Sequence, residues 1–383
     1  MPIKPLRKPL LPTHFSVWCD PPDEAGDEIL HVVSERRSLT LKGRAFREFT
    51  RIVVPRLDGR HTVAELQAAA ADVFRPADLA ESLELLHDQG VLADGEADGA
   101  RYVAPGGARM APQLNLLHEL APGQDLQARL AAATVAVIGL GGAGTATALS
   151  LGAAGVGTVR CIDWLPIVDT DVYFSPWLGL DAVGGGRAAA TAGLLRRAAP
   201  EVNATAHDAP LDSEPALAEV IAGADFVVCC LDAGMSNLVF KLNRVCLASG
   251  TRWIACALSG PELIVGPAIH PGRSACYLCY RMRSVACAGN PEQAYNYERR
   301  LDKRKRDDGG VRENFVFSAN LAAGFVGIEV VKELTGYAEP SLTGRLLTIR
   351  LTDLAIERHT VLRKPWCPAC FPNPAGGSGT DVR

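Results

Sequence analysis

The feature that most constrains the fold of this chain is a short apolar strand, a glycine-rich turn and a helix in direct succession. Residues 135–138 read Val-Ala-Val-Ile, residues 139–144 read Gly-Leu-Gly-Gly-Ala-Gly, and residues 145–154 have the composition of a helix. Glycine lets backbone N–H groups approach a phosphate, and the partial positive charge of the helix start adds attraction. The turn therefore predicts a nucleotide site of the Rossmann type, with backbone contacts at Gly139, Gly141 and Gly144.

An acidic residue at the end of the next strand supports the nucleotide prediction. Residues 158–162 form a strand-like run that ends on Asp163. A carboxylate at this point is placed to accept a hydrogen bond from a ribose hydroxyl. The alternative interpretation is that the glycines only pack the helix against the strand and that the site holds no nucleotide. The sequence leaves both interpretations open.

Strands and helices alternate after this motif, which indicates an α/β domain with a largely parallel sheet. The apolar run at 226–230, Phe-Val-Val-Cys-Cys, is typical of a strand buried on both faces. The other expected strands are 204–206, 252–258 and 263–269, and the expected helices are 188–198, 214–222, 237–249 and 314–334.

The clearest metal signal is a pair of Cys-x-x-Cys motifs that lie far apart in the chain. Two such motifs can close a tetrahedral thiolate cage if the chain between them folds back. No histidine or carboxylate stands nearby to offer an open coordination position, so the pattern favours a structural zinc ion. Free buried thiols or a redox-active pair are the alternatives. The four expected ligands are Cys276, Cys279, Cys367 and Cys370.

Composition excludes several classes of protein. The chain has 383 residues, 48% hydrophobic and 21% charged, with a formal net charge of -4. A slightly acidic chain of this kind does not bind nucleic acid through bulk charge. It contains no apolar run long enough to cross a membrane and no signal-peptide pattern, so we expect a cytoplasmic protein without a membrane partner. Its 11 cysteines are then metal ligands or buried small hydrophobes rather than disulfides.

Residues 1–105 are expected to form a separate small module. Three short strands are predicted at 16–20, 29–34 and 38–41. Three helices follow, the second of which starts with a capping box because Thr62 is followed three residues later by Glu65. Short segments at 91–92 and 102–103 are expected to close a wing, which makes the module a winged helix.

This order of elements, with the segment LDGRHTVAELQ, resembles the PqqD-like peptide-recognition module of peptide-modifying pathways. The resemblance implies that the leader of a precursor peptide adds as a strand beside the third strand and lies against the third helix. A module that only braces its neighbour, or that binds DNA, is the alternative, and the acidic third helix disfavours DNA. The implied peptide-binding residues are Ser38, Leu39, Thr40, Leu41, Lys42, Leu79, Leu83 and Leu86.

Residues 126–371 resemble the ThiF/MoeB superfamily of adenylating domains of the ubiquitin-activating type. The matching segments are VAVIGLGGAGTATALSLGAAGVGTVRCID, ADFVVCCLDAGMSN, ACYLCY and WCPAC. The resemblance implies an ATP and magnesium site that includes Asp163 and Asp232, with Arg187 at the place of a phosphate-binding lysine. Residues 168–176 lack the Asn and Arg that grip the phosphates in active members. Positioned positive charge provides most of the catalysis of nucleotidyl transfer. The missing Asn and Arg therefore favour a domain that acts as a scaffold and does not use ATP.

The resemblance also suggests roles for the remaining segments. Residues 106–125 are expected to be a linker and residues 372–383 a disordered tail. Residues 284–312 correspond to a crossover loop that can carry a nucleophilic cysteine, for which Cys287 is the candidate, although its neighbouring basic run at 299–306 is more typical of a solvated helix face. The helix at 314–334 is of the kind that packs in a homodimer.

The combination of the two domains is similar to the leader-peptide-binding component of cyclodehydratases in thiazole/oxazole-modified microcin (TOMM) pathways. This resemblance implies that the chain captures the leader and delivers the core to a separate YcaO-type enzyme, which forms azolines at Cys, Ser or Thr. Such a chain raises the local concentration of substrate without an active site of its own. The first alternative is a true adenylating enzyme that modifies a peptide carboxyl or amide. The second is a dinucleotide-dependent oxidoreductase, for which no hydride-site acid is evident.

Overall fold

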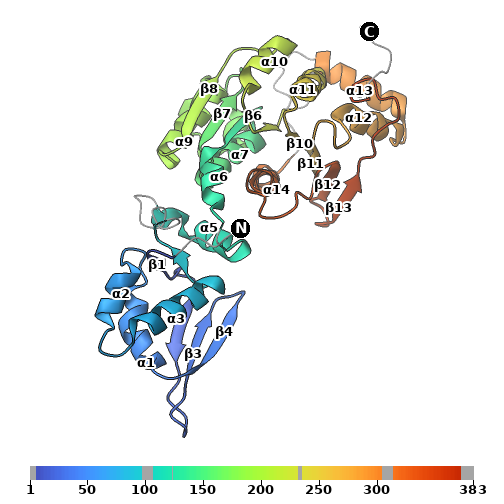
Figure 1. Ribbon diagram of the computed structural model, residues 1–383. Helices are drawn as coiled ribbons and strands as arrows, with labels where there is room; N and C mark the ends of the chain where they lie inside the picture. Colours follow the sequence, from blue (N-terminus) through green and yellow to red (C-terminus); the bar gives the residue numbers. More distant parts are fainter. Residues whose placement is uncertain (1–5, 97–106, 123, 232–234, 304–313, 372–383) are drawn as a thin grey trace. The chain divides into compact units, whose positions relative to one another are not determined.

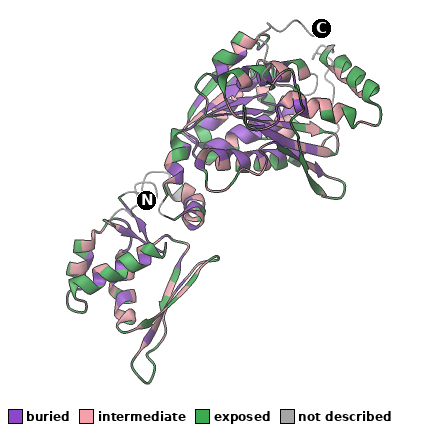
Figure 2. Cartoon of the chain, turned by 45° about the vertical axis from the view of Figure 1, so that its right-hand side comes forward, coloured by how far each residue is buried: buried purple, intermediate pink, exposed green. Residues whose placement is uncertain are grey.

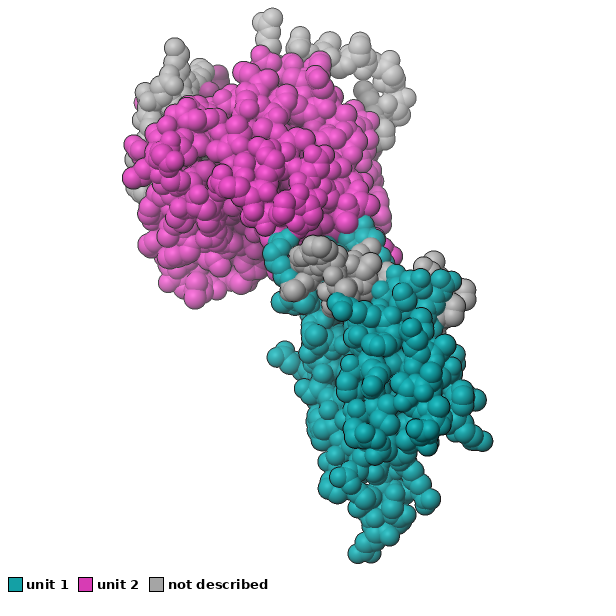
Figure 3. Space-filling model, turned by 90° about the vertical axis from the view of Figure 1, so that its left-hand side faces the viewer, with its two compact units in different colours: residues 1–128 teal, residues 129–383 magenta. Residues whose placement is uncertain are grey.

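The computed structural model describes residues 6–96, 107–122, 124–231, 235–303 and 314–371. The chain divides into two compact units, residues 1–128 and 129–383 (Figure 3). None of the described helices combines the length and the apolarity that a membrane span requires.

The sheet of the first unit has the three strands that the sequence predicts. They are β2 (Ser16–Cys19), β3 (Glu28–Val33) and β4 (Ser38–Gly43), antiparallel in the order β2-β3-β4. Leu30 and Val32 of β3 are buried against the helices of the unit, whereas β4 alternates between exposed and half-buried residues. Because β4 pairs only with β3 among the described strands, its outer edge is free.

The helices of the first unit cover one face of this sheet (Figure 1). Thr62 and Glu65 form the predicted capping box, with the Glu65 N–H donating to the Thr62 hydroxyl over 3.2 Å. Leu79, Leu83 and Leu86 on the helix α3 (Pro76–Asp88) are 1%, 1% and 4% exposed, so this stripe is core. In chain order the helical segments before α3 are α1 (Phe46–Glu48), η1 (Phe49–Val53), η2 (Val54–Arg56) and α2 (Val63–Ala69).

Two expectations for the end of this unit are corrected. The 91–92 segment does not form a wing; instead β5 (Ala93–Asp94) pairs with β1 (Pro9–Leu10), and residues 102–103 lie outside the described residues. The expected linker at 106–125 contains helix α5 (Gly107–Leu120). Arg37 donates to the carbonyl of Glu119 near the end of α5 over 3.1 Å.

The second unit is built on a sheet of eight strands. Its order is β13-β12-β11-β10-β9-β6-β7-β8, parallel from β8 to β10 and antiparallel from β10 to β13. The strands are β6 (Thr134–Ile138), β7 (Thr158–Ile162), β8 (Asn203–His207), β9 (Phe226–Cys229), β10 (Trp253–Ser259), β11 (Glu262–Ile269), β12 (Arg345–Arg350) and β13 (Ile356–Thr360). The last two were not expected from the sequence.

Helices cover both faces of this sheet, which confirms the α/β fold class (Figures 1 and 2). Val135 and Val137 of β6 pack with α7, α9 and α14 on one face, whereas Ala136 and Ile138 pack with α10 and α11 on the other. In chain order the helical segments are α6 (Leu126–Ala132), α7 (Gly142–Ala153), α8 (Asp169–Phe174), η3 (Leu180–Ala182), α9 (Arg187–Ala198), α10 (Glu214–Ile221), α11 (Ser236–Ser249), α12 (Tyr277–Ala286), α13 (Pro291–Lys303) and α14 (Val316–Thr335).

The strand order places the glycine turn at a topological switch point of the sheet. From β6 the chain continues to β7 and β8 on one side, and then returns to β9 on the other side of β6. In open α/β sheets the carboxyl ends of strands at such a point form the usual ligand crevice. The region predicted as a crossover loop holds the helix α13, and its residues 304–312 lie outside the described residues.

Candidate functional site

The glycine turn joins β6 to α7 with very close backbone approaches. Gly139 has φ 86, and a Cβ added there would lie 2.7 Å from the carbonyl oxygen of Cys230. A Cβ on Gly144 would lie 1.7 Å from the Gly139 oxygen, and Gly141 is the N-cap of α7. Packing of strand, turn and helix therefore requires glycine at 139 and 144 whether or not a nucleotide binds.

Asp163 is directed at this turn by backbone hydrogen bonds. Its side chain is 3% exposed, one carboxylate oxygen accepts from the Leu140 N–H over 2.7 Å, and the other accepts from the Leu165 N–H over 2.9 Å. The oxygen that bonds Leu140 is also 3.4 Å from Arg187. The carboxylate predicted to hold a ribose is thus already bonded within the chain.

Arg187 begins α9 and is buried beside two carboxylates. Its guanidinium donates to both oxygens of Asp171, over 2.8 Å from Nε and 2.7 Å from Nη2, and contacts Asp163 through Nη1. Asp171 also accepts from the Val168 N–H over 3.0 Å. A two-point arginine–carboxylate pair is among the stronger charged contacts in proteins. These three side chains, which we call the buried charge cluster, are each under a tenth exposed.

Two side chains pack closely against Gly142, the first residue of α7. A Cβ added to Gly142 would lie 2.5 Å from the Cβ of Phe174 on α8 and 3.1 Å from the Cβ of Ala319 on α14. A phosphate at a helix start needs access to these first N–H groups. No role was predicted from the sequence for Asp171 or Phe174. Both lie in the segment 168–176, which lacks the expected Asn and Arg. Asp232 lies outside the described residues.

The four predicted metal ligands come together in one cluster. Cys276 precedes α12 and Cys279 lies in its first turn, while the other two belong to the 366–371 turn, and the four sulfur atoms all lie within 4.8 Å of one another. Three sulfur pairs are 3.6, 3.7 and 3.9 Å apart. A tetrahedral zinc ion with Zn–S bonds of about 2.3 Å requires sulfur separations of about 3.8 Å. The cluster Cys276, Cys279, Cys367 and Cys370 therefore fits a metal ion of this type.

The surroundings of the sulfur atoms shift the thiol pKa values in opposite directions. Burial raises the pKa of the Cys370 thiol to about 11. Burial also acts to raise the pKa of Cys279, but hydrogen bonds from the Lys364 N–H and from neighbouring thiols outweigh it, and that pKa is lowered. The Lys364 N–H lies 3.3 Å from the Cys279 sulfur. Backbone N–H donors of this kind stabilise thiolates and orient them toward a metal.

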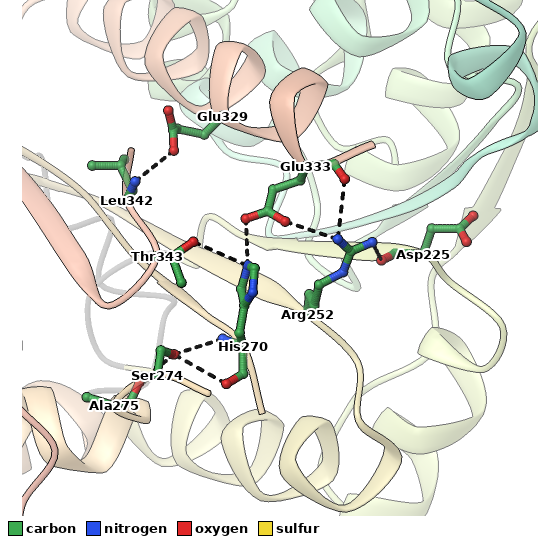
Figure 4. A network of polar contacts seen from close by, with 9 residues as sticks. All are labelled: Asp225, Arg252, His270, Ser274, Ala275, Glu329, Glu333, Leu342 and Thr343. Atoms are coloured by element: carbon green, nitrogen blue, oxygen red, sulfur yellow. Dashed lines mark hydrogen bonds and ion pairs between the residues drawn. The ribbon is translucent and has the colours of Figure 1, made fainter. Parts of the chain in front are cut away.

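A polar network anchors the chain that leads into Cys276 (Figure 4). Glu333 of α14 is 1% exposed and bonds His270 over 2.6 Å and Arg252 over 3.1 Å. The His270 N–H in turn donates to the Ser274 hydroxyl over 2.9 Å. The network thus connects α14 to the loop between β11 and the first cysteine motif.

Cys287 is exposed and ends α12. Among the described residues no hydrogen bond or ion pair reaches its thiol. Arg283, four residues before Cys287, donates to the Leu362 carbonyl over 2.8 Å. A nucleophilic role for Cys287 stays a prediction without a described partner.

The predicted peptide-binding residues divide into two groups. Ser38, Thr40 and Lys42 of β4 are exposed, and Leu39 and Leu41 are half-buried at the margin of the core. The three leucines of α3 lie inside the first unit's own core and offer no surface to a peptide. They are Leu79, Leu83 and Leu86.

Fold and site together define an α/β protein with a glycine turn of the nucleotide-binding type and a four-cysteine cluster. The ThiF family model matches residues 111–369, and the chain belongs to the ThiF family. Its sequence is 26% identical over 254 residues to the sulfur carrier protein adenylyltransferase of Thermus thermophilus, covering 66% of this chain and 87% of that protein.

Solved structures with a similar fold include MccB. The structure of the microcin C7 biosynthetic enzyme MccB with N-formylated MccA matches with a TM-score of 0.64 and 18% identity, covering 95% of this chain and 99% of that one. Escherichia coli MccB with ATP matches with a TM-score of 0.62 and 17% identity over the same shares. The similarity extends over both units of this chain, since it covers nearly all of it.

Proposed function

We propose that this chain binds the leader of a ribosomally made precursor peptide and presents the core to a separate YcaO-type cyclodehydratase for azoline formation. In this proposal the ThiF-type unit is a scaffold that does not turn over ATP. The first unit acts as the PqqD-like recognition module. MccB, a structurally similar protein, has been solved with a peptide, which supports a peptide as the ligand.

The observation that carries the proposal is the buried charge cluster. A nucleotide triphosphate needs positive charge that is not already neutralised, because phosphoryl oxygens carry the developing charge. Arg187 faces two carboxylates, Asp163 and Asp171, so the cluster carries a net negative charge when all three groups are ionised. Phe174 packs against Gly142 and places an apolar side chain at the start of α7. Both features oppose the binding of a polyphosphate at the glycine turn.

The free edge of β4 supports peptide binding by strand addition. An added strand gains backbone hydrogen bonds from the edge, and its alternate side chains contact the two faces of the sheet. Leu39 and Leu41 lie half-buried on the side of the core, so they offer apolar contacts to one set of those side chains.

We further propose that the chain forms a homodimer through α14. Three large apolar side chains lie exposed at helical spacing along one stripe of this helix, at 52%, 41% and 52% of their area for Phe317, Leu321 and Ile328. A continuous apolar stripe of this kind is typical of a buried interface. The cysteine cluster would hold a structural zinc ion, which would fasten the C-terminal turn to α12.

The proposal is tested by reconstitution with the precursor peptide and the partner cyclodehydratase. We expect azoline formation, followed by mass spectrometry as the loss of one water per ring, to require this chain. The variant Leu41→Glu should raise the peptide Kd, and Leu354→Glu, an exposed control in the second unit, should not. Full modification without this chain, or unchanged peptide binding by Leu41→Glu, would contradict the proposal.

A second function is favoured by one observation, the intact glycine turn together with the similarity to MccB solved with ATP. In this alternative the chain is itself an adenylating enzyme that modifies a peptide carboxyl or amide with ATP and magnesium. It predicts release of pyrophosphate that depends on the peptide. It also predicts that Arg187→Ala abolishes this release.

A further inference from the structure

One face of the three-stranded sheet in the first unit lies opposite the helices. Leu30 and Val32 of β3 face the core, so the residues that alternate with them on this strand point to the other face. Directly paired residues of neighbouring strands point the same way, so the register assigns the side chains of β2 and β4 as well. We call this the open face. Its residues are Ser16, Trp18, Ile29, His31, Val33, Ser38, Thr40 and Lys42.

Two aromatic rings stack on the open face. Trp18 of β2 is paired with His31 of β3, and their ring centroids lie 4.8 Å apart with 12° between the ring planes. A hydrogen bond of 2.8 Å between His31 Nε2 and the Asp20 carboxylate holds the histidine ring in this orientation. Trp18 is nevertheless 44% exposed, although its indole carries a large apolar surface. A stacked, partly exposed pair of this kind offers a flat surface to a further ring.

The stack points toward the free edge of the sheet. Because the two rings stack across neighbouring strands, the face of His31 that Trp18 leaves free is turned toward β4. The residue of β4 that is paired with His31 is Thr40, which is exposed and has a short side chain. These three residues form one row across the sheet, which we call the Trp18 row. The row has large rings on β2 and β3 and a small side chain at the edge.

The two neighbouring rows of the open face differ from the Trp18 row at β3 or at the edge. In one of them Lys42 is paired with Ile29, and its Nζ lies 3.1 Å from Asp23, so a long side chain held by a carboxylate occupies the edge. In the other, Ser38 is paired with Val33, an aliphatic residue without a flat face. Among these three rows, the Trp18 row alone combines a planar ring with a small residue at the edge.

We propose that the peptide segment recognised by this unit carries one aromatic side chain that packs over Thr40 and extends the stack of Trp18 and His31. This inference rests on the proposed function, namely peptide binding by strand addition at β4. An added strand lies about 4.8 Å beyond β4, and every second side chain of it points to the open face. Aromatic side chains reach neighbours about 7–8 Å away across a sheet, so a ring opposite Thr40 can pass over this short residue toward His31.

Other side chains use this position less well. A short side chain would contact Thr40 alone and would leave the free face of His31 uncovered. An aliphatic side chain would gain apolar contact but not the offset stacking that ring pairs prefer. The inference therefore assigns to the Trp18 row the choice of one residue of the peptide, while Leu39 and Leu41 contact the side chains that alternate with it.

The experiment is a display selection of random 12-residue peptides on the immobilised full chain. We expect an aromatic residue at one fixed position of the enriched peptides, with no such preference two positions before or after it. Thr40→Tyr fills the same space from the edge strand itself, so selection on this variant should lose the preference. Ser16→Tyr introduces the same ring on the open face at β2 and is the control that should keep it.

A double-mutant cycle with one selected peptide gives the quantitative test. His31→Ala and replacement of the aromatic residue of the peptide by leucine should each weaken binding. The two changes should couple by about two- to tenfold in Kd, because stacked rings contribute beyond the area that they bury. Fluorescence anisotropy of the labelled peptide measures each Kd.

The outcomes separate this inference from the proposed function. Additive effects in the cycle, an enriched set without the aromatic position, or a preference that survives Thr40→Tyr would each overturn the inference while peptide recognition stood. Loss of the preference on Ser16→Tyr alone would place the peptide at the edge of β2 and would overturn both the inference and the proposed binding edge. No enrichment at all would contradict the proposed function as well.

Discussion

The cysteine cluster and the glycine turn of the second unit differ in how far the chain satisfies its own polar groups. At the cysteine cluster, the four sulfur atoms lie within 4.8 Å of one another, with three pairs 3.6 to 3.9 Å apart, and a cation at their centre would complete the site. At the glycine turn, Asp163, Asp171 and Arg187 already satisfy one another. The same fold thus presents one region whose four thiols face a common centre and another whose charged groups pair with one another.

The difference has an energetic consequence. Four buried thiols bind a metal only as the chain folds, so the binding energy becomes folding energy. A buried ion pair stabilises only while both partners are present, because removal of either leaves an uncompensated charge. Removal of the metal should therefore destabilise the fold around the cysteine cluster. Removal of a charged side chain should destabilise the fold around the glycine turn.

The largest effect is expected for Cys276→Ser. Loss of one ligand should release the metal and lower the free energy of unfolding by more than about 5 kcal/mol, since structural zinc contributes directly to folding. Metal content by mass spectrometry and thermal unfolding with and without chelator measure both changes. Cys287→Ser, at an exposed cysteine, is the control and should change neither. Full metal content in the Cys276 variant would contradict the assignment of the cluster.

The next largest effect is expected for Arg187→Ala. Two buried carboxylates would lose their common partner, which should cost about 3–5 kcal/mol in the free energy of unfolding. Urea denaturation of the full chain measures it. Arg197→Ala, at an exposed position of the same helix, should stay within about 0.5 kcal/mol of the unaltered chain. Equal effects of the two variants would mean that the charge cluster does not stabilise the fold.

A smaller effect is expected for Glu333→Gln in the network behind the first cysteine motif. The buried amide would keep the shape but weaken the contacts to His270 and Arg252, for a loss of about 1–3 kcal/mol. Because the network anchors the loop before Cys276, metal affinity should also fall, by roughly tenfold. Competition with a chromogenic chelator measures that affinity. Glu357→Gln on β13, whose side chain is half exposed, is the control.

These regions also show what the sequence could and could not predict. The glycine turn, the parallel strands and the four cysteines follow local patterns whose chemistry dictates the residue type, and the structure has each of them. The cluster of Asp171 with Arg187 was missed because the two residues lie on different helices, and only the tertiary fold brings them together. The absence of Asn and Arg from residues 168–176 was the available signal.

Other misses have physical reasons as well. β13 is exposed along its length, so it lacks the alternation that indicates a half-buried strand. Helix α5 was taken as a linker because proline and glycine dominate its beginning, whereas its end is held by Arg37. The leucines of α3 were assigned to a peptide surface although their spacing also suits a core stripe, and the core is where they lie.

The smallest effect is expected for a variant designed to give the glycine turn a weak affinity for ATP. The double variant Asp171→Asn, Phe174→Arg would remove one competing carboxylate and uncover the start of α7. We expect ATP and magnesium to bind this variant in the millimolar range or somewhat more tightly, measured by fluorescence of a labelled nucleotide. Phe174→Leu is the control, since it keeps the apolar cover. Nucleotide binding to the control equal to that of the double variant would contradict this explanation.

The central claim is that the glycine turn of the native chain does not hold ATP. The most direct test is a calorimetric titration of the metal-loaded full chain with ATP and magnesium, with pyrophosphate release assayed in the same samples beside a precursor peptide. We predict no saturable heat from ATP and no pyrophosphate, with or without peptide. Saturable ATP binding followed by peptide-dependent pyrophosphate release would contradict the claim and identify the chain as an adenylating enzyme.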